Sequence, residues 1–172
     1  EGVRWIVDPF DGSLNGSRGI PISAVSISLW DSLNPLIGVV YDFNRDEVFT
    51  GTIAKGAYLN GQKISVSKVE DKSNAVLFTG FPSQSNYLTE KLLKFVHKVQ
   101  DFKKVRLLGS AALSLAYVAC GRGDAYSENG IMLWDVAAGL ALVKFAGGGL
   151  QMKRIDKNKY KVFASNGKIP LK

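Results

Sequence analysis

The sequence predicts a layered α/β fold, with an antiparallel strand meander in the first half and a mixed sheet with helices in the second. Short runs of β-branched and aromatic residues, separated by Asn-Gly and Gly turns, dominate residues 1–80. In residues 81–172, segments of helical periodicity alternate with strand-like runs. Hydrophobic residues make up 46% and charged residues 22%, as in an ordinary globular protein. We interpret residues 1–172 as one region without repeats or linkers.

The strands of the first half follow one another closely. Residues 3–7 predict a strand that stops at the turn-rich stretch "DPFDGSLNGSRG". The segments "ISAVSISLW" and "LIGVVYDF" predict a hairpin, because small polar and apolar residues alternate in the first and the turn "DSLNP" separates the two. The segments "EVFTGTI", "GAYLNGQKI" and "NAVLFTGF" then continue the meander.

The second half alternates helices with strands. The apolar spacing of residues 86–102 predicts an amphipathic helix, with His97 on its surface. "KVRLLG" predicts a strand, "SAALSLAYVACG" a helix capped by Ser110, and "GDAYSE" a short strand. "WDVAAGLALVKFAGG" predicts a helix that ends in glycines, and "KYKVFASN" a final strand. This alternation favours parallel pairing in the second sheet.

The charge and cysteine content restrict the function classes. The net charge of +7 suits either a nucleic-acid partner or small anionic substrates. The densest basic run, residues 152–161, is expected to be a solvated face, and no nucleic-acid motif accompanies it. Cys120 is the single cysteine, expected in the core, so no intrachain disulfide forms and a reducing compartment is favoured. No apolar run reaches the roughly 20 residues that span a bilayer, so we expect a cytoplasmic protein without a membrane partner.

Two carboxylates close to the first strand form the clearest chemical feature. Asp8 and Asp11 lie where the strand meets the polar stretch, and carboxylates held at a strand end are ligands that hard cations such as Mg²⁺ prefer. A helix beginning near Gly12 would add free amides and the Ser13 hydroxyl, which favour a bound phosphate. The alternative is that both aspartates are ordinary turn and cap residues.

A second acidic position lies far along the chain. Asp135 follows Trp134 at the start of the alanine-rich helix, where an aspartate either caps the helix or directs its carboxylate outward. Glu128 is less informative, because a glutamate at the end of a short strand is usually solvated. Three acids directed into one cleft would repel one another in the absence of cations, which favours a metal site.

The stretches "WIVDPFDGSLNGSRGIP" and "LWDVAAGLALVKFAGG" resemble the paired signatures of the inositol monophosphatase family of metal-dependent, lithium-sensitive phosphatases. The stretch "GVVYDFNRDEVFTGTIAKGAYLNGQKISVS" is similar to the central hairpins of that family, so the resemblance covers nearly the whole chain. It implies the sugar-phosphatase fold of alternating helix and sheet layers.

The resemblance also implies roles for individual residues. Asp8 would bridge two metal ions, Asp11 and Asp135 would bind the second ion, and the backbone carbonyl of Phe10 would bind the first. The amides of Gly12 and Ser13 would hold phosphate oxygens, and the Ser13 hydroxyl would align the attacking water. The residues matching the substrate side of the family's pocket are Gly109, Ser110, Ala111 and Glu128.

As a family member, the chain would use two or three Mg²⁺ ions, with Mn²⁺ as a substitute, to activate water for direct attack on phosphorus. The implied substrate is inositol 1-phosphate or a related small phosphorylated polyol, and the implied assembly is a homodimer without nucleic acid. Fructose-1,6-bisphosphatase or dual activity is an alternative, because "DGSLNGSRGIP" resembles archaeal members that combine both. A nucleotide-type 3'-phosphatase substrate also stays open.

The family pattern includes an N-terminal helical layer and an acidic pair before the first strand. The printed sequence begins four residues before Trp5, so we expect it to be the C-terminal portion of a longer enzyme, with little activity alone. The alternative of another class is a non-catalytic module that binds anions.

Overall fold

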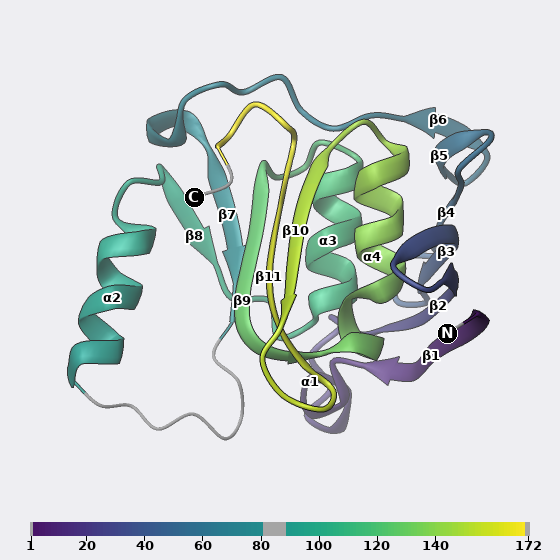
Figure 1. Cartoon of the computed structure of the whole chain (residues 1–172), viewed down its shortest axis with the longest axis horizontal. Coiled ribbons are helices and arrows are strands. Elements are labelled where there is room, and N and C mark those ends of the chain that lie inside the picture. Colours follow the sequence, from purple (N-terminus) through teal and green to yellow (C-terminus); the bar gives the residue numbers. More distant parts are fainter. Residues whose placement is uncertain (1, 81–88, 171–172) are drawn as a thin grey trace.

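The first half of the chain forms a six-stranded antiparallel sheet in the computed structural model, which describes residues 2–80 and 89–170 (Figure 1). The strands are β1 (Val3–Asp11), β2 (Ala24–Asp31), β3 (Asn34–Asp42), β4 (Glu47–Thr52), β5 (Gly56–Leu59) and β6 (Gln62–Ile64). Each strand pairs with the next in sequence. The predicted meander is therefore confirmed for these six strands.

The second sheet has five strands in the order β10-β11-β9-β7-β8. They are β7 (Val76–Thr79), β8 (Lys104–Arg106), β9 (Ala125–Met132), β10 (Gly149–Arg154) and β11 (Lys159–Ser165). Strand β7 pairs in parallel with β8 and β9, whereas β11 pairs antiparallel with β9 and β10. The predicted mixed sheet is confirmed.

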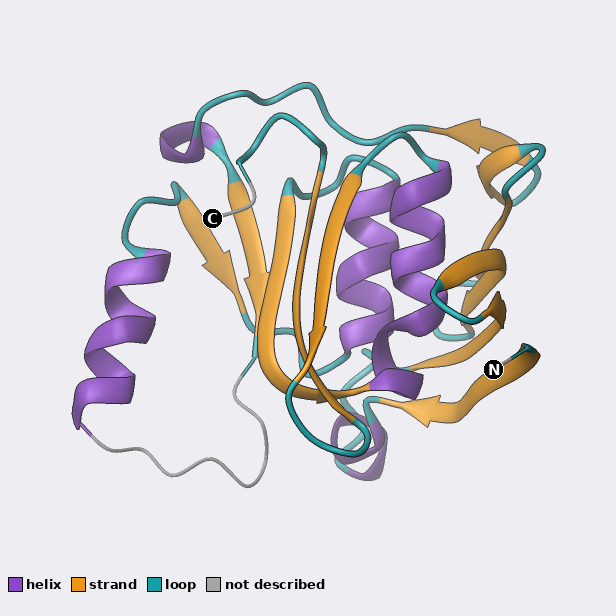
Figure 2. Cartoon of the chain, viewed as in Figure 1, coloured by secondary structure: helices purple, strands orange, loops and turns teal. Residues whose placement is uncertain are grey.

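Helices α3 and α4 lie side by side between the two sheets, and α2 lies on the other face of the mixed sheet (Figure 2). The helices are α1 (Ser13–Ser17), the 3-10 helix η1 (Lys72–Asn74), α2 (Thr89–Val99), α3 (Ala111–Ala119) and α4 (Leu133–Phe145). Residues 86–88 of the predicted amphipathic helix lie outside the described residues. No helix within the described ranges is both long and apolar enough to span a membrane.

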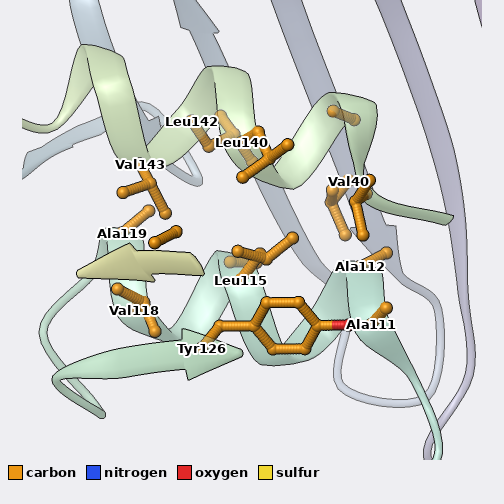
Figure 3. Close-up of a cluster of buried hydrophobic side chains, with 14 of the residues drawn as sticks. Val40, Ala111, Ala112, Leu115, Val118, Ala119, Tyr126, Leu140, Leu142 and Val143 are labelled. Carbon is orange, nitrogen blue, oxygen red and sulfur yellow. The ribbon is translucent and has the colours of Figure 1, made fainter. Parts of the chain in front are cut away.

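The core surrounds α3 and α4, which are buried on nearly every side. Small residues allow these helices to pack closely, and Leu115 of α3 belongs to the same buried cluster as Leu140 and Val143 of α4 (Figure 3). A helix that is apolar all round belongs in an interior layer. A smaller cluster, formed by Leu77, Phe102, Ala125 and Phe163 among others, fills the face of the mixed sheet near α2.

Three strand predictions need correction. Strand β1 continues to Asp11 instead of stopping at Val7, because Pro9 is tolerated on an edge strand that needs no hydrogen bond on its outer side. The segment "NAVLFTGF" contains β7, which leaves the meander and pairs in the second sheet. Strand β10 is not predicted, because its basic residues match the pattern of a solvated surface.

The predicted solvent exposure is confirmed for His97 but not for Cys120. His97 is exposed on α2, as predicted. Cys120 was expected in the core but is only half-buried, because it caps the C-terminal end of α3 at the edge of the core. Burial still raises the pKa of the Cys120 thiol.

Gly139 of α4 provides a test of the close contact between the two central helices. A Cβ atom added at Gly139 would lie 2.4 Å from Cβ of Leu115. Gly→Ala within a helix normally stabilises by about 1 kcal/mol. Here we expect Gly139→Ala to lower the free energy of unfolding by about 1–3 kcal/mol, because overpacking dominates. Urea denaturation measures the change, and a more stable variant would contradict this packing.

Candidate metal centre

A β-bulge near the end of β1 brings Asp8 and Asp11 to the same face of the first sheet. Asp8 lies opposite Ser26 and Asp11 opposite Ala24, so β1 has one extra residue in this interval. In a regular strand, side chains three positions apart project from opposite faces. The bulge instead directs both carboxylates to the buried side of β2, which α4 contacts.

Asp11 is also bound to the N-terminal end of α3. Its side chain is 7% exposed and accepts hydrogen bonds from the Ser110 hydroxyl and from the Ala112 amide, the latter at 3.0 Å. Ser110 accepts from the Leu113 amide at 3.2 Å, which confirms it as the predicted cap of α3. A carboxylate is favoured there, because the free amides of a helix N-terminus carry partial positive charge.

Asp135 lies in the first turn of α4. The helix begins at Leu133 with Met132 as its cap, so the alternative in which Asp135 is itself the N-cap is wrong. Asp135 is the third helical residue, and its Oδ2 accepts from the Met132 amide at 3.3 Å. The half-buried carboxylate thus closes the first turn of α4 beside the bulge of β1.

The three aspartates form one cluster. One carboxylate oxygen from each of Asp8, Asp11 and Asp135 lies within 4.8 Å of the others. Burial, and then repulsion by Asp11 and Asp8, raises the pKa of Asp135 to about 7. Burial raises the pKa of Asp11 to about 6, with a smaller contribution from Asp8. The repulsion is relieved by a cation with oxygen ligands, so the cluster could hold a metal ion.

The cluster opens into a cavity of about 1370 Å³ that is also lined by Phe10, Gly12 and Ser13. Gly12 caps α1 with φ 78°, and a Cβ atom there would lie 2.6 Å from the Ile22 carbonyl oxygen, so the position requires glycine. Ser13 is the exposed first residue of α1. The Phe10 ring stacks on Phe43 with a centroid distance of 6.0 Å.

The remaining predicted residues line the same cavity: Gly109, Ser110, Ala111 and Glu128. Glu128 lies within β9 and is 8% exposed, so the expectation of a solvated glutamate is wrong. Its carboxylate accepts from the Tyr126 hydroxyl at 2.8 Å, and burial is the main cause of its raised pKa. The structure therefore brings every predicted site residue to one cavity.

Sequence reasoning missed Asn15, which links the stretch "WIVDPFDGSLNGSRGIP" to the segment before α3. Its Nδ2 donates to the Ile22 carbonyl at 2.9 Å and to the Leu108 carbonyl at 2.8 Å. An asparagine between glycines and serines reads as a turn residue, and no local signal indicates its bond to Leu108.

Comparison with known proteins assigns the family. Residues 1–168 match the model of the inositol monophosphatase family. The chain is 45% identical over 147 residues to "Nus factor SuhB" of Xylella fastidiosa, covering 85% of this chain and 54% of that protein. It is 38% identical over 169 residues to "Inositol-1-monophosphatase" of Synechocystis, covering 96% of this chain and 59% of that protein. The chain thus spans somewhat more than half the length of these curated relatives.

Solved structures agree. The inositol monophosphatase from Anabaena superposes with a TM-score of 0.87 and 37% sequence identity, covering 98% of this chain and 68% of that one. A family match over nearly the whole length and a shared fold at this identity agree with the cluster of aspartates at the junction of the two motifs. The chain belongs to the inositol monophosphatase family.

Proposed function

We propose that this protein is a magnesium-dependent phosphomonoesterase that hydrolyses inositol 1-phosphate and related sugar phosphates. The observation that carries the proposal is the convergence of Asp8, Asp11 and Asp135 from two distant segments into one cavity. The relative named inositol-1-monophosphatase supports the choice of substrate.

In this proposal the aspartates and the backbone carbonyl of Phe10 hold two or three Mg²⁺ ions, with Mn²⁺ as a possible substitute. The chemistry of the donors fits, because hard cations prefer carboxylate and carbonyl oxygens. When bound, the ions supply a water of lowered pKa and neutralise charge on the leaving oxygen. The raised pKa values of Asp11 and Asp135 support the assignment, since burial first and neighbouring carboxylates second disfavour their charged forms, and a bound cation would compensate both effects.

The other residues bind and orient the substrate. The amides of Gly12 and Ser13 hold oxygens of the phosphate, and the Ser13 hydroxyl aligns the attacking water. Glu128 accepts a hydrogen bond from a substrate hydroxyl. The segment from Gly109 to Ala111 lines the polyol side of the pocket. All of these residues border the cavity that contains the aspartates, which supports the roles.

A substrate panel tests the proposal with the protein expressed from its full coding sequence. We expect phosphate release from inositol 1-phosphate in the presence of Mg²⁺ and loss of that release after chelation by EDTA. Release from fructose 1,6-bisphosphate would favour the alternative of fructose-1,6-bisphosphatase or dual activity. Binding of phosphate esters without release, in Mg²⁺, would favour a non-catalytic anion-binding module instead.

We further propose that the partners are small phosphorylated molecules and a second copy of the chain, in the cytoplasm, rather than nucleic acid. Leu92, Leu93 and Val96 of α2 are exposed, which supports a protein-facing surface. A nucleic-acid partner would produce duplex affinity that falls steeply as salt rises. Sedimentation velocity together with a salt series of duplex binding separates these alternatives.

A further inference from the structure

Glu128 places a carboxylate in a closely packed part of the site. Its side chain is 8% exposed, and it lines the cavity that contains the aspartates. Among residues 2–80 and 89–170, no lysine or arginine forms a salt bridge with it. A buried carboxylate without a paired cation is costly unless hydrogen bonds stabilise it. The groups that contact Glu128 therefore determine where its carboxylate lies.

Tyr126 provides a hydrogen bond to this carboxylate. Its hydroxyl donates to Oε2 of Glu128 at 2.8 Å. The two residues are two positions apart in β9, so both project from the same face of the mixed sheet. Tyr126 is almost completely buried, and burial raises its pKa, so the hydroxyl keeps its proton and acts as the donor. A charge-assisted hydrogen bond of this kind fixes the orientation of the carboxylate.

Gly80 restricts the same carboxylate from a second direction. Gly80 follows β7, whose last residue, Thr79, pairs with Ser127 of β9, so the parallel register brings Gly80 next to Glu128. A Cβ atom at Gly80 would lie 2.8 Å from Oε2 of Glu128 and 3.3 Å from its Cδ. The φ angle of Gly80 is not positive, so the space taken by Glu128, and not the backbone, excludes a side chain there.

The first turn of α3 connects Tyr126 to the aspartates. Tyr126 and Ala111 belong to one buried cluster (Figure 3). On either side of Ala111, the Ser110 hydroxyl and the Ala112 amide donate to Asp11. Tyr126 thus fixes Glu128 relative to the same helix that binds Asp11.

We propose that Tyr126 and Gly80 are positioning residues, which hold the Glu128 carboxylate where it recognises a hydroxyl group of the substrate. This inference rests on the proposed function, in which Glu128 accepts a hydrogen bond from the substrate. Both residues act through Glu128 and not on the phosphate. They favour phosphate esters of hydroxylated rings, because a site built to bind a hydroxyl rejects analogues that leave its buried polar group unpaired.

The test compares inositol 1-phosphate with 4-nitrophenyl phosphate, whose ring carries no hydroxyl, on the protein expressed from its full coding sequence. Tyr126→Phe removes only the oxygen that donates to Glu128. We expect it to raise the ratio of the KM for inositol 1-phosphate to the KM for 4-nitrophenyl phosphate at least about fivefold, a usual loss for a hydrogen bond to a charged group. The change should affect KM more than kcat, because a contact with a non-reacting hydroxyl is made equally in the bound state and the transition state. An unchanged ratio would remove the role of Tyr126.

Gly80→Ala displaces the carboxylate without removing a hydrogen-bonding group. The added methyl group meets the end of a flexible side chain, so Glu128 moves and the backbone does not. We expect the same KM ratio to rise at least about fivefold. The Tm should stay at or above that of wild type, because alanine lowers the entropy of the unfolded chain. A lower Tm with an unchanged ratio would instead show a structural role and overturn the role of Gly80.

Tyr160→Phe is the matched control, because Tyr160 is a buried tyrosine of the neighbouring strand β11 that does not line the cavity. It should leave the ratio unchanged. A double-mutant cycle shows whether the effects act through Glu128. In the Glu128→Ala background, Tyr126→Phe and Gly80→Ala should each change the ratio less than about twofold. Effects as large as in the wild-type background would contradict the proposal.

A binding measurement separates this inference from the proposed function. Titration calorimetry with inositol 1-phosphate and Ca²⁺ in place of Mg²⁺ reads affinity without turnover. If no phosphate ester is hydrolysed but Tyr126→Phe still weakens calorimetric binding at least about fivefold, the positioning role stands and the proposed function fails. If phosphate is released but Tyr126→Phe and Gly80→Ala change neither the KM ratio nor the calorimetric affinity, the positioning role is wrong and the proposed function stands.

Discussion

Replacing Asp135 with Asn is expected to lower the rate of magnesium-dependent phosphate release at least about 100-fold. Mutation of a residue that only hydrogen-bonds to a metal ligand already lowers metal affinity or activity by about 10–100-fold, and Asp135 is proposed to bind the metal itself. The substitution removes one negative charge from the cluster of three carboxylates. It keeps an oxygen that accepts from the Met132 amide, so the first turn of α4 is retained. Steady-state kinetics on inositol 1-phosphate, with circular dichroism as a check of folding, measure the effect.

Asp71→Asn is the matched control, since Asp71 is an exposed carboxylate that does not line the cavity. It should retain the wild-type rate. Asp8→Asn should resemble Asp135→Asn, because both residues belong to the cluster. A folded Asp135→Asn protein with unchanged kcat/KM would remove Asp135 from the proposed site.

Acidification from pH 8 to pH 5 is expected to weaken the apparent affinity for Mg²⁺ at least about 100-fold. The pKa of Asp135 is raised to about 7 and that of Asp11 to about 6, so both carboxyls take up protons within this range. A ligand must be deprotonated to bind metal, and each pH unit below its pKa costs roughly tenfold. Mn²⁺ or Mg²⁺ titrations followed by tryptophan fluorescence measure the midpoint, with Trp134 adjacent to the cluster.

The raised pKa values of Asp11 and Asp135 also determine how the stability of the metal-free protein depends on pH. The ordinary pKa of 3.8 applies in the unfolded chain, so the metal-free folded protein binds more protons between about pH 4 and pH 7. These two groups therefore stabilise the fold at low pH, and their contribution is lost as pH rises through 6 to 7. Mg²⁺ should accordingly raise Tm more at pH 8 than at pH 5. Asp135→Asn should flatten this pH dependence, and a metal affinity independent of pH in the wild type would contradict the assignment.

Most helices and strands were predictable from the sequence, because each is marked by features within its own stretch of chain. The alternation in β2, the Ser110 cap of α3 and the glycines after α4 are visible in a single stretch of chain. The place of β7 was not predictable in this way. Its apolar run matches the meander strands that precede it, and only pairing with β8 and β9 assigns it to the second sheet.

The two aspartate motifs were evident in the sequence, but their geometry was not. Plain alternation along β1 would place Asp8 and Asp11 on opposite faces, and the bulge that unites them is a property of the register with β2. Burial of Glu128 likewise depends on its central position in the mixed sheet, which the short predicted strand did not reveal.

The positions of the lysines that line the cavity were likewise not predictable from the sequence. The run at residues 152–161 was predicted to be a solvated face, and Lys153 and Arg154 are indeed exposed. Lys159 and Lys161 nevertheless line the cavity, because the return strand β11 pairs with β9 and carries them to the site. Lys98 reaches the same place from a helix whose spacing indicated only amphipathicity.

Crystals of the protein soaked in Mn²⁺, with anomalous differences recorded at the manganese absorption edge, show directly whether the three aspartates bind a metal ion. We expect at least one manganese peak within coordination distance of carboxylate oxygens from Asp8, Asp11 and Asp135. A map that places manganese only elsewhere, with these three carboxylates bound to water or to one another, would contradict it.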